Sequence, residues 1–365
     1  MSSKRRKGNS PKGAQASASK KAASRYGRAG RVRVWDDTLL KELEAAQKAL
    51  EKRYLGKKGL LHRKTSTAEL AENVRENVIG VGIGEKRRNN LPQGELCLTI
   101  FVRKKLTPGR VADGQQLPAK FRKFVVDVEE MGDIRPAPVT GDAVTLLPSQ
   151  VVRPLQPGCS VGVVGANAQP IAGTFGALVR KGNELFILSN NHVLADENRL
   201  ALGAPVFQPS PMDSSAQVPV ATLATVIPLQ TGSPNLMDAA IARLPAGAGV
   251  RPEIFNLRAP SATGAPTLHL PVEKFGRSTN YRAGVISNPN IGIDLPYGIG
   301  TLTFRNQVVI RSEPGSRFAT DGDSGALILQ RGTNVAIGLL HSCNGTYAIA
   351  SPIAAVLKEL GVTFA

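Results

Sequence analysis

The sequence is poor in cysteine and histidine, and it lacks any long uninterrupted apolar run. Its three cysteines, Cys97, Cys159 and Cys343, argue against a disulfide framework and leave a single bridge as the alternative. Four histidines and no C-x-x-C motif argue against a structural zinc site. The charged start MSSKRRKGNS has no apolar segment of a secretory signal, and no apolar run reaches about 18 residues. We therefore expect no membrane association and a cytoplasmic location.

Acidic residues are missing from the first 33 positions, which hold eleven Lys and Arg. The formal charge of +18 is therefore mostly that of a tail, because the other 35 basic residues face 28 acids. The tail, residues 1–35, has too few large apolar side chains to offset the entropy of ordering, so it is predicted to be disordered. Two roles stay open for residues 1–33: a solubilising extension, or an arm that binds nucleic acid or an acidic partner.

The remainder divides into a predicted small α+β domain, residues 36–140, and a predicted β domain, residues 141–365. The stretch DDTLLKELEAAQKALEKRYLG predicts one amphipathic helix that stops at Gly56, and NVIGVGIG and ELCLTIFVRKK are typical of strands. From about residue 143, short apolar runs are broken by Gly, Pro, Asn and Ser, which predicts a sandwich or barrel. Only SPIAAVLKELGV, near the C-terminus, predicts a helix there.

A serine lies between two glycines in TDGDSGALIL, and it is a candidate nucleophile. Serine needs a base to remove its proton and an acid to orient that base. The base candidate is His192, which follows an apolar strand in FILSNNHVLAD, and the acid candidate is Asp238, which precedes an apolar run in NLMDAAIARL. Asp196 and Asp213 are alternative acids, although Asp196 lies only four residues after the histidine and favours a turn or cap. The predicted catalytic residues are thus His192, Asp238 and Ser324.

The glycines around Ser324 have a predicted mechanical role. A developing oxyanion needs two backbone N–H groups aimed at one point, and Gly322 and Gly325 allow the sharp turn that this requires. The predicted oxyanion hole consists of the amides of Gly322 and Ser324. Asp323, between them, is interpreted as an anchor for the loop and not as a base.

The set of motifs resembles known families. GDSG downstream of NHVL and DAAIA resembles the chymotrypsin-like serine peptidases, which have two six-stranded β-barrels and the order His, Asp, Ser. QPGCSVG, AGTFGALVR, FQPSPMD, EKFGRSTNYRAGVIS and SPIAAVLKELGV extend a resemblance to bacterial trypsin-like proteins related to the plant narrow-leaf protease, over about residues 77–365. The resemblance implies a mostly β, chymotrypsin-like double barrel with a C-terminal helix, preceded by the α+β domain and the tail.

The resemblance also implies a function. It predicts an intracellular, bacterial serine endopeptidase that hydrolyses protein or peptide substrates through an acyl-enzyme, with no metal or organic cofactor. A homo-oligomer is a further expectation, because relatives in the plant family are thought to assemble. Residues 36–140 and the tail would then govern recruitment, assembly or autoinhibition.

The same resemblance places three residues at the substrate pocket. Phe318 occupies the position where trypsin-type enzymes carry an acid, which disfavours cleavage after Lys or Arg. Cys343 would line the pocket as a small apolar group. His341, in GLLHSC, has two interpretations, pairing with an acidic substrate side chain or simple packing. The remaining histidines, His62 and His269, are interpreted as structural.

Two other readings use the same residues. One is a catalytically silent trypsin-fold scaffold or binding protein, whose basic tail contacts nucleic acid or an acidic partner. The other is a peptidase that is inactive until a partner binds. A reactive probe aimed at Ser324 distinguishes the scaffold from the enzyme.

Overall fold

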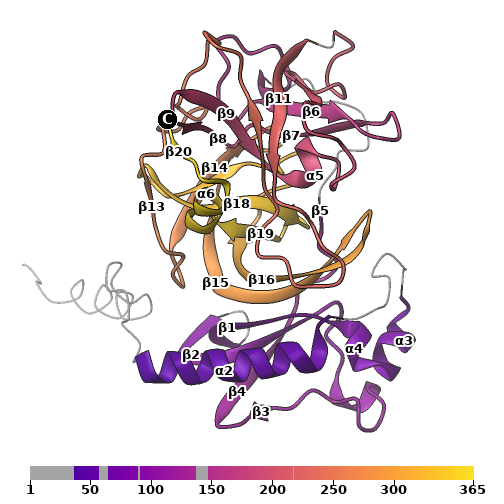
Figure 1. Cartoon of the computed structure of the whole chain (residues 1–365). Coiled ribbons are helices and arrows are strands. Elements are labelled where there is room, and N and C mark those ends of the chain that lie inside the picture. The colour runs from indigo at the N-terminus through magenta and orange to yellow at the C-terminus, as the bar shows by residue number, and fades with distance from the viewer. Residues whose placement is uncertain (1–36, 57–64, 89–90, 137–146, 217) are drawn as a thin grey trace, which may run out of the picture. The chain divides into compact units, whose positions relative to one another are not determined.

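The structure is a computed structural model that describes residues 37–56, 65–88, 91–136, 147–216 and 218–365 (Figure 1). The basic tail and His62 lie outside the described residues, so their predicted roles stay predictions. Residues 43–365 form one compact unit, and every contact discussed below lies within it.

Strands predominate over helices in the described residues. The α-helices are α2 (Asp37–Tyr54), α3 (Thr67–Glu72), α4 (Val74–Asn77), α5 (Asn191–Leu194) and α6 (Ile353–Leu360), and two 3-10 turns span Pro108–Arg110 and Leu147–Ser149. One sheet contains β6 (Ser160–Val164), β7 (Pro170–Thr174), β8 (Ala177–Lys181), β9 (Glu184–Ser189), β10 (Pro205–Phe207), β11 (Pro219–Val226), β12 (Ala240–Arg243) and β20 (Thr363–Phe364). The other contains β1 (Val78–Arg88), β2 (Leu91–Val102), β3 (Lys120–Phe121), β4 (Phe124–Glu130), β5 (Arg135–Pro136), β13 (Ala262–Thr263), β14 (Pro271–Gly276), β15 (Asn280–Tyr297), β16 (Gly300–Ser312), β17 (Leu327–Gln330), β18 (Val335–Cys343) and β19 (Tyr347–Pro352).

The eight-stranded sheet has the order β20-β8-β9-β12-β11-β10-β6-β7. Its strands are short apolar runs separated by turns, as the sequence indicated. Some of their buried side chains form a core that includes Val161, Leu178, Ile187 and Ala240, and others, such as Leu188, belong to a second core with α6. Helix α5 follows β9 directly, and its Leu194 packs into the first of these cores.

Six strands of the larger sheet close into a ring. Their order is β14-β17-β18-β19-β16-β15, and β14 pairs with β15 as well as with β17. The ring has its own core, in which Ile286, Ile310, Phe318 and Ile328 are buried. The prediction of a mostly β fold with a C-terminal helix is confirmed. Strands predominate, and the last helix, α6, is followed only by the short β20.

The hairpin of β15 and β16 extends beyond this ring and continues into the N-terminal strands (Figure 1). Gly80 to Gly82 of β1 pair with Ile291 to Ile293 of β15. At Gly82 a methyl group would lie 2.3 Å from Ile291 Cγ2, so this close approach of two strands requires glycine. The predicted domain division near residue 140 stays a prediction, and the larger sheet contains strands from both sides of it.

Helix α2 covers the span that the 3.6-residue periodicity predicts. Leu43, Ala46 and Leu50 are fully buried along one face, and Gly56, at φ 77°, follows the helix. Glu51 is also buried on this face, and its Oε2 lies 3.4 Å from Nε of Arg305 on β16. The helix is therefore attached by apolar packing and by one charged pair.

The three cysteines are buried free thiols, so the single disulfide that their number left open does not form. Burial raises the pKa of each thiol to about 12, which keeps all three protonated near neutral pH. None of the helices in the described ranges combines the length and the apolar character needed to span a bilayer.

Candidate active site

His192 and Asp238 are brought together by neighbouring elements of the smaller sheet. His192 lies on α5, immediately after β9, and Asp238 precedes β12, which pairs with β9. His192 Nδ1 lies 2.5 Å from Asp238 Oδ2, and both side chains are almost fully buried. This contact orients the imidazole so that its other nitrogen, Nε2, is left for chemistry.

The Asp238 carboxylate is held by four donors. Oδ1 accepts hydrogen bonds from the amides of Asn191 and His192 at 2.7 and 3.3 Å. Oδ2 accepts from His192 and, at 2.8 Å, from the hydroxyl of Tyr297 at the end of β15. Burial alone would raise the pKa of Asp238, but His192 and these donors outweigh burial and hold the pKa below its ordinary value. Asp238 is therefore an anion at neutral pH.

Ser324 lies in the loop before β17, close to the helix that carries His192. A methyl group on Gly173 would lie 2.6 Å from Val193 Cγ2 and 2.9 Å from the Ser324 carbonyl oxygen, so both segments approach the same glycine. Ser324 Oγ donates a 3.2 Å hydrogen bond to the carbonyl oxygen of His341. In the described part of the chain, His192 Nε2 is buried and has no hydrogen-bond partner.

The loop around Ser324 presents two free amides. Gly322 and Gly325 have φ values of 91° and 92°, which favour glycine, and the amides of Gly322 and Ser324 donate to no acceptor within the described residues. Thr174 fixes the loop from the smaller sheet, because its Oγ1 donates to the Gly322 carbonyl at 2.9 Å and its amide to the Ser324 carbonyl at 2.8 Å. Two backbone donors that point at one spot can stabilise an oxyanion, which is the role predicted for these amides.

Asp323 anchors the loop from the other side, in agreement with its interpretation as an anchor. Its carboxylate lies 3.0 Å from Lys274 Nζ, and both side chains are fully buried. The amides of Ser278 and Thr279 and the hydroxyl of Thr279 also donate to it, at 2.9, 3.1 and 2.6 Å. Burial would raise the pKa of Asp323, but the Lys274 charge and these donors hold the pKa below its usual range.

The alternative acids have other partners. Asp196 accepts from the amide of Ala166 at 2.9 Å and pairs with Arg199 at 2.6 Å, which is the turn or cap expected of it. Asp213 forms an ion pair with Arg277 and accepts from the hydroxyl of Ser210. His269, expected to be structural, forms a half-exposed pair with Glu85.

The three predicted pocket residues are buried. Phe318 and Cys343 belong to the core of the six-stranded ring. His341 is fully buried on β18; its ring stacks on Phe304, and its Nε2 lies 2.9 Å from Gln307 Oε1. Burial lowers the pKa of His341 to about 4, so its ring is neutral near pH 7. These contacts favour the packing interpretation of His341.

Two residues of this site were missed by the sequence reasoning. Tyr297 ends an 18-residue strand, and no local pattern indicates that its hydroxyl meets Asp238. Lys274 left a weak signal, a charged residue inside the apolar strand PVEKFG, where a buried cation requires an acidic partner.

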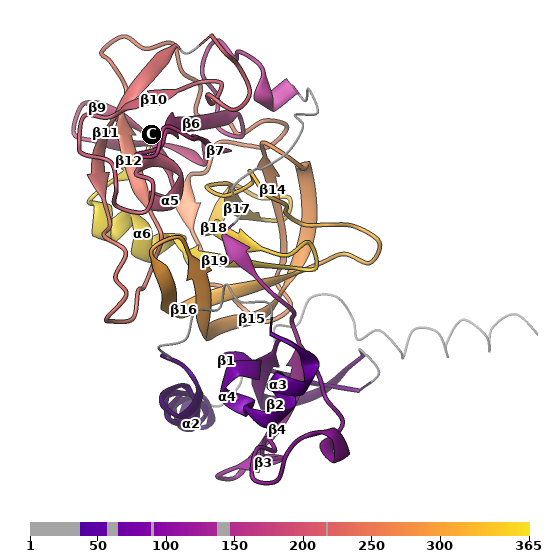
Figure 2. The ribbon, with the colours of Figure 1, turned by 90° about the vertical axis from the view of Figure 1, so that its right-hand side faces the viewer.

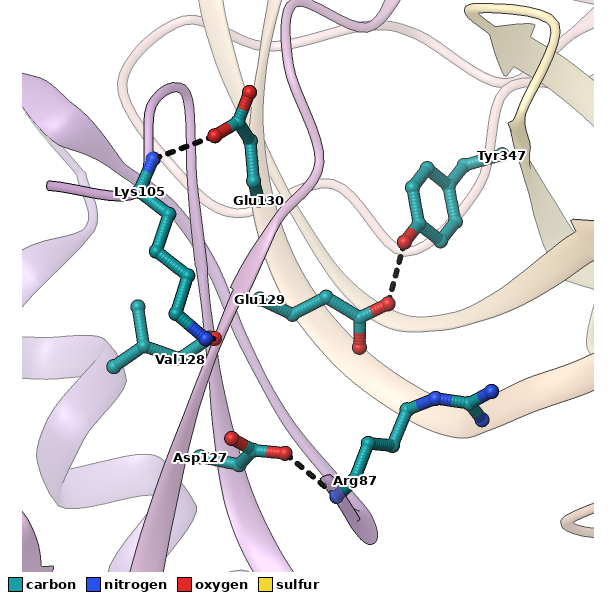
Figure 3. A pocket seen from close by; sticks show the side chains of 7 residues that line it. All are labelled: Arg87, Lys105, Asp127, Val128, Glu129, Glu130 and Tyr347. Atoms are coloured by element: carbon teal, nitrogen blue, oxygen red, sulfur yellow. Dashed lines mark hydrogen bonds between the residues drawn. The ribbon is translucent and has the colours of Figure 1, made fainter. Parts of the chain in front are cut away.

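A separate polar pocket of about 320 Å³ lies away from these residues (Figure 3). Its lining comes from β1, β4, the segment after β2, and β19: Arg87, Lys105, Asp127, Val128, Glu129, Glu130 and Tyr347. No cluster of three or more His, Cys, Asp or Glu in the described ranges is arranged to hold a metal ion.

Comparison with known proteins finds a peptidase family model and similar solved structures. The model of peptidase family S64 matches residues 233–363, about a third of the chain, including Asp238 and Ser324 but not His192. Similar solved structures include a glutamic-acid-specific serine protease (20% identity, TM-score 0.44), Thermobifida fusca protease A (18%, 0.43) and Cellulomonas bogoriensis chymotrypsin (20%, 0.41). Each covers 57 to 58% of this chain and 97 to 100% of the other, and the likeness concerns the fold alone. No curated protein matches the sequence.

Proposed function

We propose that the protein is a serine endopeptidase with the catalytic residues His192, Asp238 and Ser324. One observation carries the proposal: the buried His192 Nε2, free of other partners in the described residues, belongs to an imidazole whose Nδ1 is bound to the Asp238 carboxylate. An imidazole held in this way can accept a proton at Nε2 from a nearby hydroxyl. The main chain of Ser324 approaches the same glycine, Gly173, as Val193 next to His192, and the match to a peptidase family model supports the same conclusion.

The proposed reaction proceeds in two halves. Ser324 Oγ attacks the scissile carbonyl carbon while its proton passes to His192 Nε2, and the amides of Gly322 and Ser324 bind the resulting oxyanion. His192 then protonates the leaving amine, the C–N bond breaks, and the acyl group stays on Ser324 as an ester. Water attacks this ester with His192 again as base, which releases the acid and restores the serine. Asp238 orients His192 and stabilises its charged form throughout.

The hydroxyl of Ser324 donates to the carbonyl of His341 at 3.2 Å, so it must turn away from this carbonyl before it can donate to His192 Nε2. The catalytic bond between serine and histidine is often loose without substrate and tightens in the complex. The bond to the His341 carbonyl is the observation that favours the second candidate, a catalytically silent scaffold. Phe318 stands where trypsin-type enzymes carry an acid. This supports a preference against Lys and Arg before the cleaved bond, because the phenyl ring offers no charge to pair with a basic side chain. The cytoplasmic location and a homo-oligomer stay predictions.

A fluorophosphonate probe tests the proposal, because it reacts covalently only with an activated serine. We expect one label per chain, located at Ser324 by peptide mass mapping, and none in Ser324→Ala. Ser233→Ala, which changes an exposed serine, is the matched control and should label at the wild-type rate. Absence of labelling in wild-type protein across pH 6 to 9 would support the scaffold instead.

A further inference from the structure

Strand β18 loses its neighbour β17 on one edge beside Ser324. On one side β19 pairs with it as far as Cys343, but on the other side β17 leaves it near Leu339. The last contacts are the Gly325 amide donating to the Leu340 carbonyl and the Leu340 amide donating to the Ala326 carbonyl, at 2.8 and 3.0 Å. A strand edge with unpaired N–H and C=O groups binds extended peptides by strand addition.

This edge is occupied by a strand of the same chain. Strand β5, Arg135–Pro136, pairs with it in antiparallel register, Arg135 opposite Cys343 and Pro136 opposite Ser342 (Figure 2). Ser342 follows His341, whose carbonyl oxygen accepts the hydrogen bond of Ser324 Oγ. Strand β5 therefore ends next to the proposed nucleophile, with its main chain in the place where an extended peptide would bind.

The residues before β5 are firmly attached. Asn344 Nδ2 donates to the Met131 carbonyl at 2.6 Å, and the Met131 amide donates to the Val102 carbonyl at 2.9 Å. Met131 and Ile134 are 2% and 3% exposed, and both belong to the core cluster that contains Tyr297. The segment is thus part of the folded core, in the same cluster as the tyrosine that donates to Asp238.

Charged contacts reinforce this attachment. Glu129, near the end of β4, accepts a hydrogen bond from the hydroxyl of Tyr347 on β19 (Figure 3). It also forms an ion pair with Arg311, so β4 is joined to β19 and β16. On the side of the serine loop, burial raises the pKa of Asp321, and the charge of Arg135 opposes this rise. The Arg135 side chain is 66% exposed and its ion pair is with Asp133, at 4.0 Å, so its guanidinium adds little to the attachment of β5.

We propose that β5 occupies the edge of β18 at Ser342–Cys343 in place of the extended main chain of a peptide substrate. The inference rests on the proposed peptidase function. A substrate chain needs the same main-chain groups that β5 uses, so the two exclude each other. The protein is then an autoinhibited peptidase. Its apparent affinity for peptides is the intrinsic affinity multiplied by the fraction of molecules in which β5 is released.

The test separates the strand edge from the serine. Pro136 has no N–H, so Arg135 is the amide donor of β5, and Arg135→Pro removes it while Arg135→Ala keeps it. Each full-length protein is given a small fluorophosphonate, which needs only the serine, and succinyl-Ala-Ala-Pro-Phe p-nitroanilide, which needs the edge of β18. We expect equal labelling in all three proteins. Hydrolysis by Arg135→Pro should rise about tenfold in kcat/KM, the effect of one lost hydrogen bond, with Arg135→Ala within about twofold of wild type.

Each outcome decides between the ideas. Intact labelling with hydrolysis by Arg135→Pro no faster than wild type would overturn the inference and leave the peptidase proposal standing. Absence of labelling in every protein would overturn the peptidase proposal, and this inference with it. If Arg135→Pro does not fold, Ile134→Ala removes the buried anchor instead, with Ile134→Val as its control, and the same comparison applies.

Discussion

The hydroxyl of Tyr297 donates a 2.8 Å hydrogen bond to Asp238 Oδ2, the same oxygen that binds His192 Nδ1. Burial, with the Asp238 charge, raises the pKa of Tyr297 well above its ordinary value, so the phenol stays protonated and can only donate to this carboxylate. Because β15 is the strand that pairs with β1, the support of the proposed catalytic acid depends on the hairpin that joins the N-terminal strands to the ring.

Removal of this donor should impair turnover without affecting substrate binding. Tyr297→Phe leaves Asp238 with one stabilising bond fewer, and we expect kcat to fall about tenfold with KM within about twofold. The pKa of Asp238 should rise, which moves the acid limb of the pH–rate profile upwards. Tyr281→Phe, a change at a partly exposed tyrosine bound to Glu273, is the control and should leave both parameters unchanged. A wild-type profile for Tyr297→Phe would refute a positioning role.

The identity of the catalytic acid can be tested by three carboxylates changed in parallel. Asp238→Asn should lower kcat/KM by about 10⁴, because the imidazole loses the partner that fixes its tautomer. Asp196→Asn should change it by less than about threefold, since its contacts are with Ala166 and Arg199. Asp213→Asn should reduce stability more than activity, because it leaves Arg277 without its ion pair. A large loss confined to Asp196→Asn would show that Asp238 is the wrong choice.

The buried pair of Lys274 and Asp323 should dominate the stability of the serine loop. Lys274→Met leaves a fully buried carboxylate without its cation, and the free energy of unfolding should fall by about 3 to 5 kcal/mol. Urea unfolding measures this change. The double variant Lys274→Met, Asp323→Asn should recover part of the loss, and Lys358→Met, at an exposed lysine, should change little. Equal stability of the single variant and wild type would mean that the pair is not needed.

The buried His341 on β18 should make the free energy of unfolding fall as the pH is lowered from 7.5 to 4.5. Its pKa is about 4 in the folded protein and 6.5 in its ordinary state, so below pH 6.5 the unfolded chain binds a proton that the folded chain does not. The stability that His341 contributes is complete above pH 6.5 and is lost as the pH falls to about 4, by roughly 3 kcal/mol. Urea unfolding between pH 7.5 and 4.5 should show this slope in wild type and a shallower one in His341→Asn. Parallel slopes would contradict it.

Much of the local structure followed from residue patterns. The spacing of Leu43, Ala46 and Leu50 predicted α2, and the short apolar runs after residue 143 predicted strands, because side-chain periodicity reflects which face of an element is buried. The motifs also predicted His192, Asp238 and Ser324 as a catalytic set. The structure brings the first two into contact, and the main chain of Ser324 approaches the same glycine as Val193.

Other features were decided only by the tertiary structure. Periodicity shows that a face is buried but not what it is buried against, so the contacts of Tyr297 with Asp238, of Lys274 with Asp323 and of β5 with β18 were not evident. Each joins residues dozens to hundreds of positions apart, and each is selected by the cost of an unpaired buried charge, hydroxyl or strand edge. The sequence by itself determined where many of the elements form and which polar side chains they carry. Folding decided which polar groups meet, because each buried group needed a partner that only the complete packing could supply.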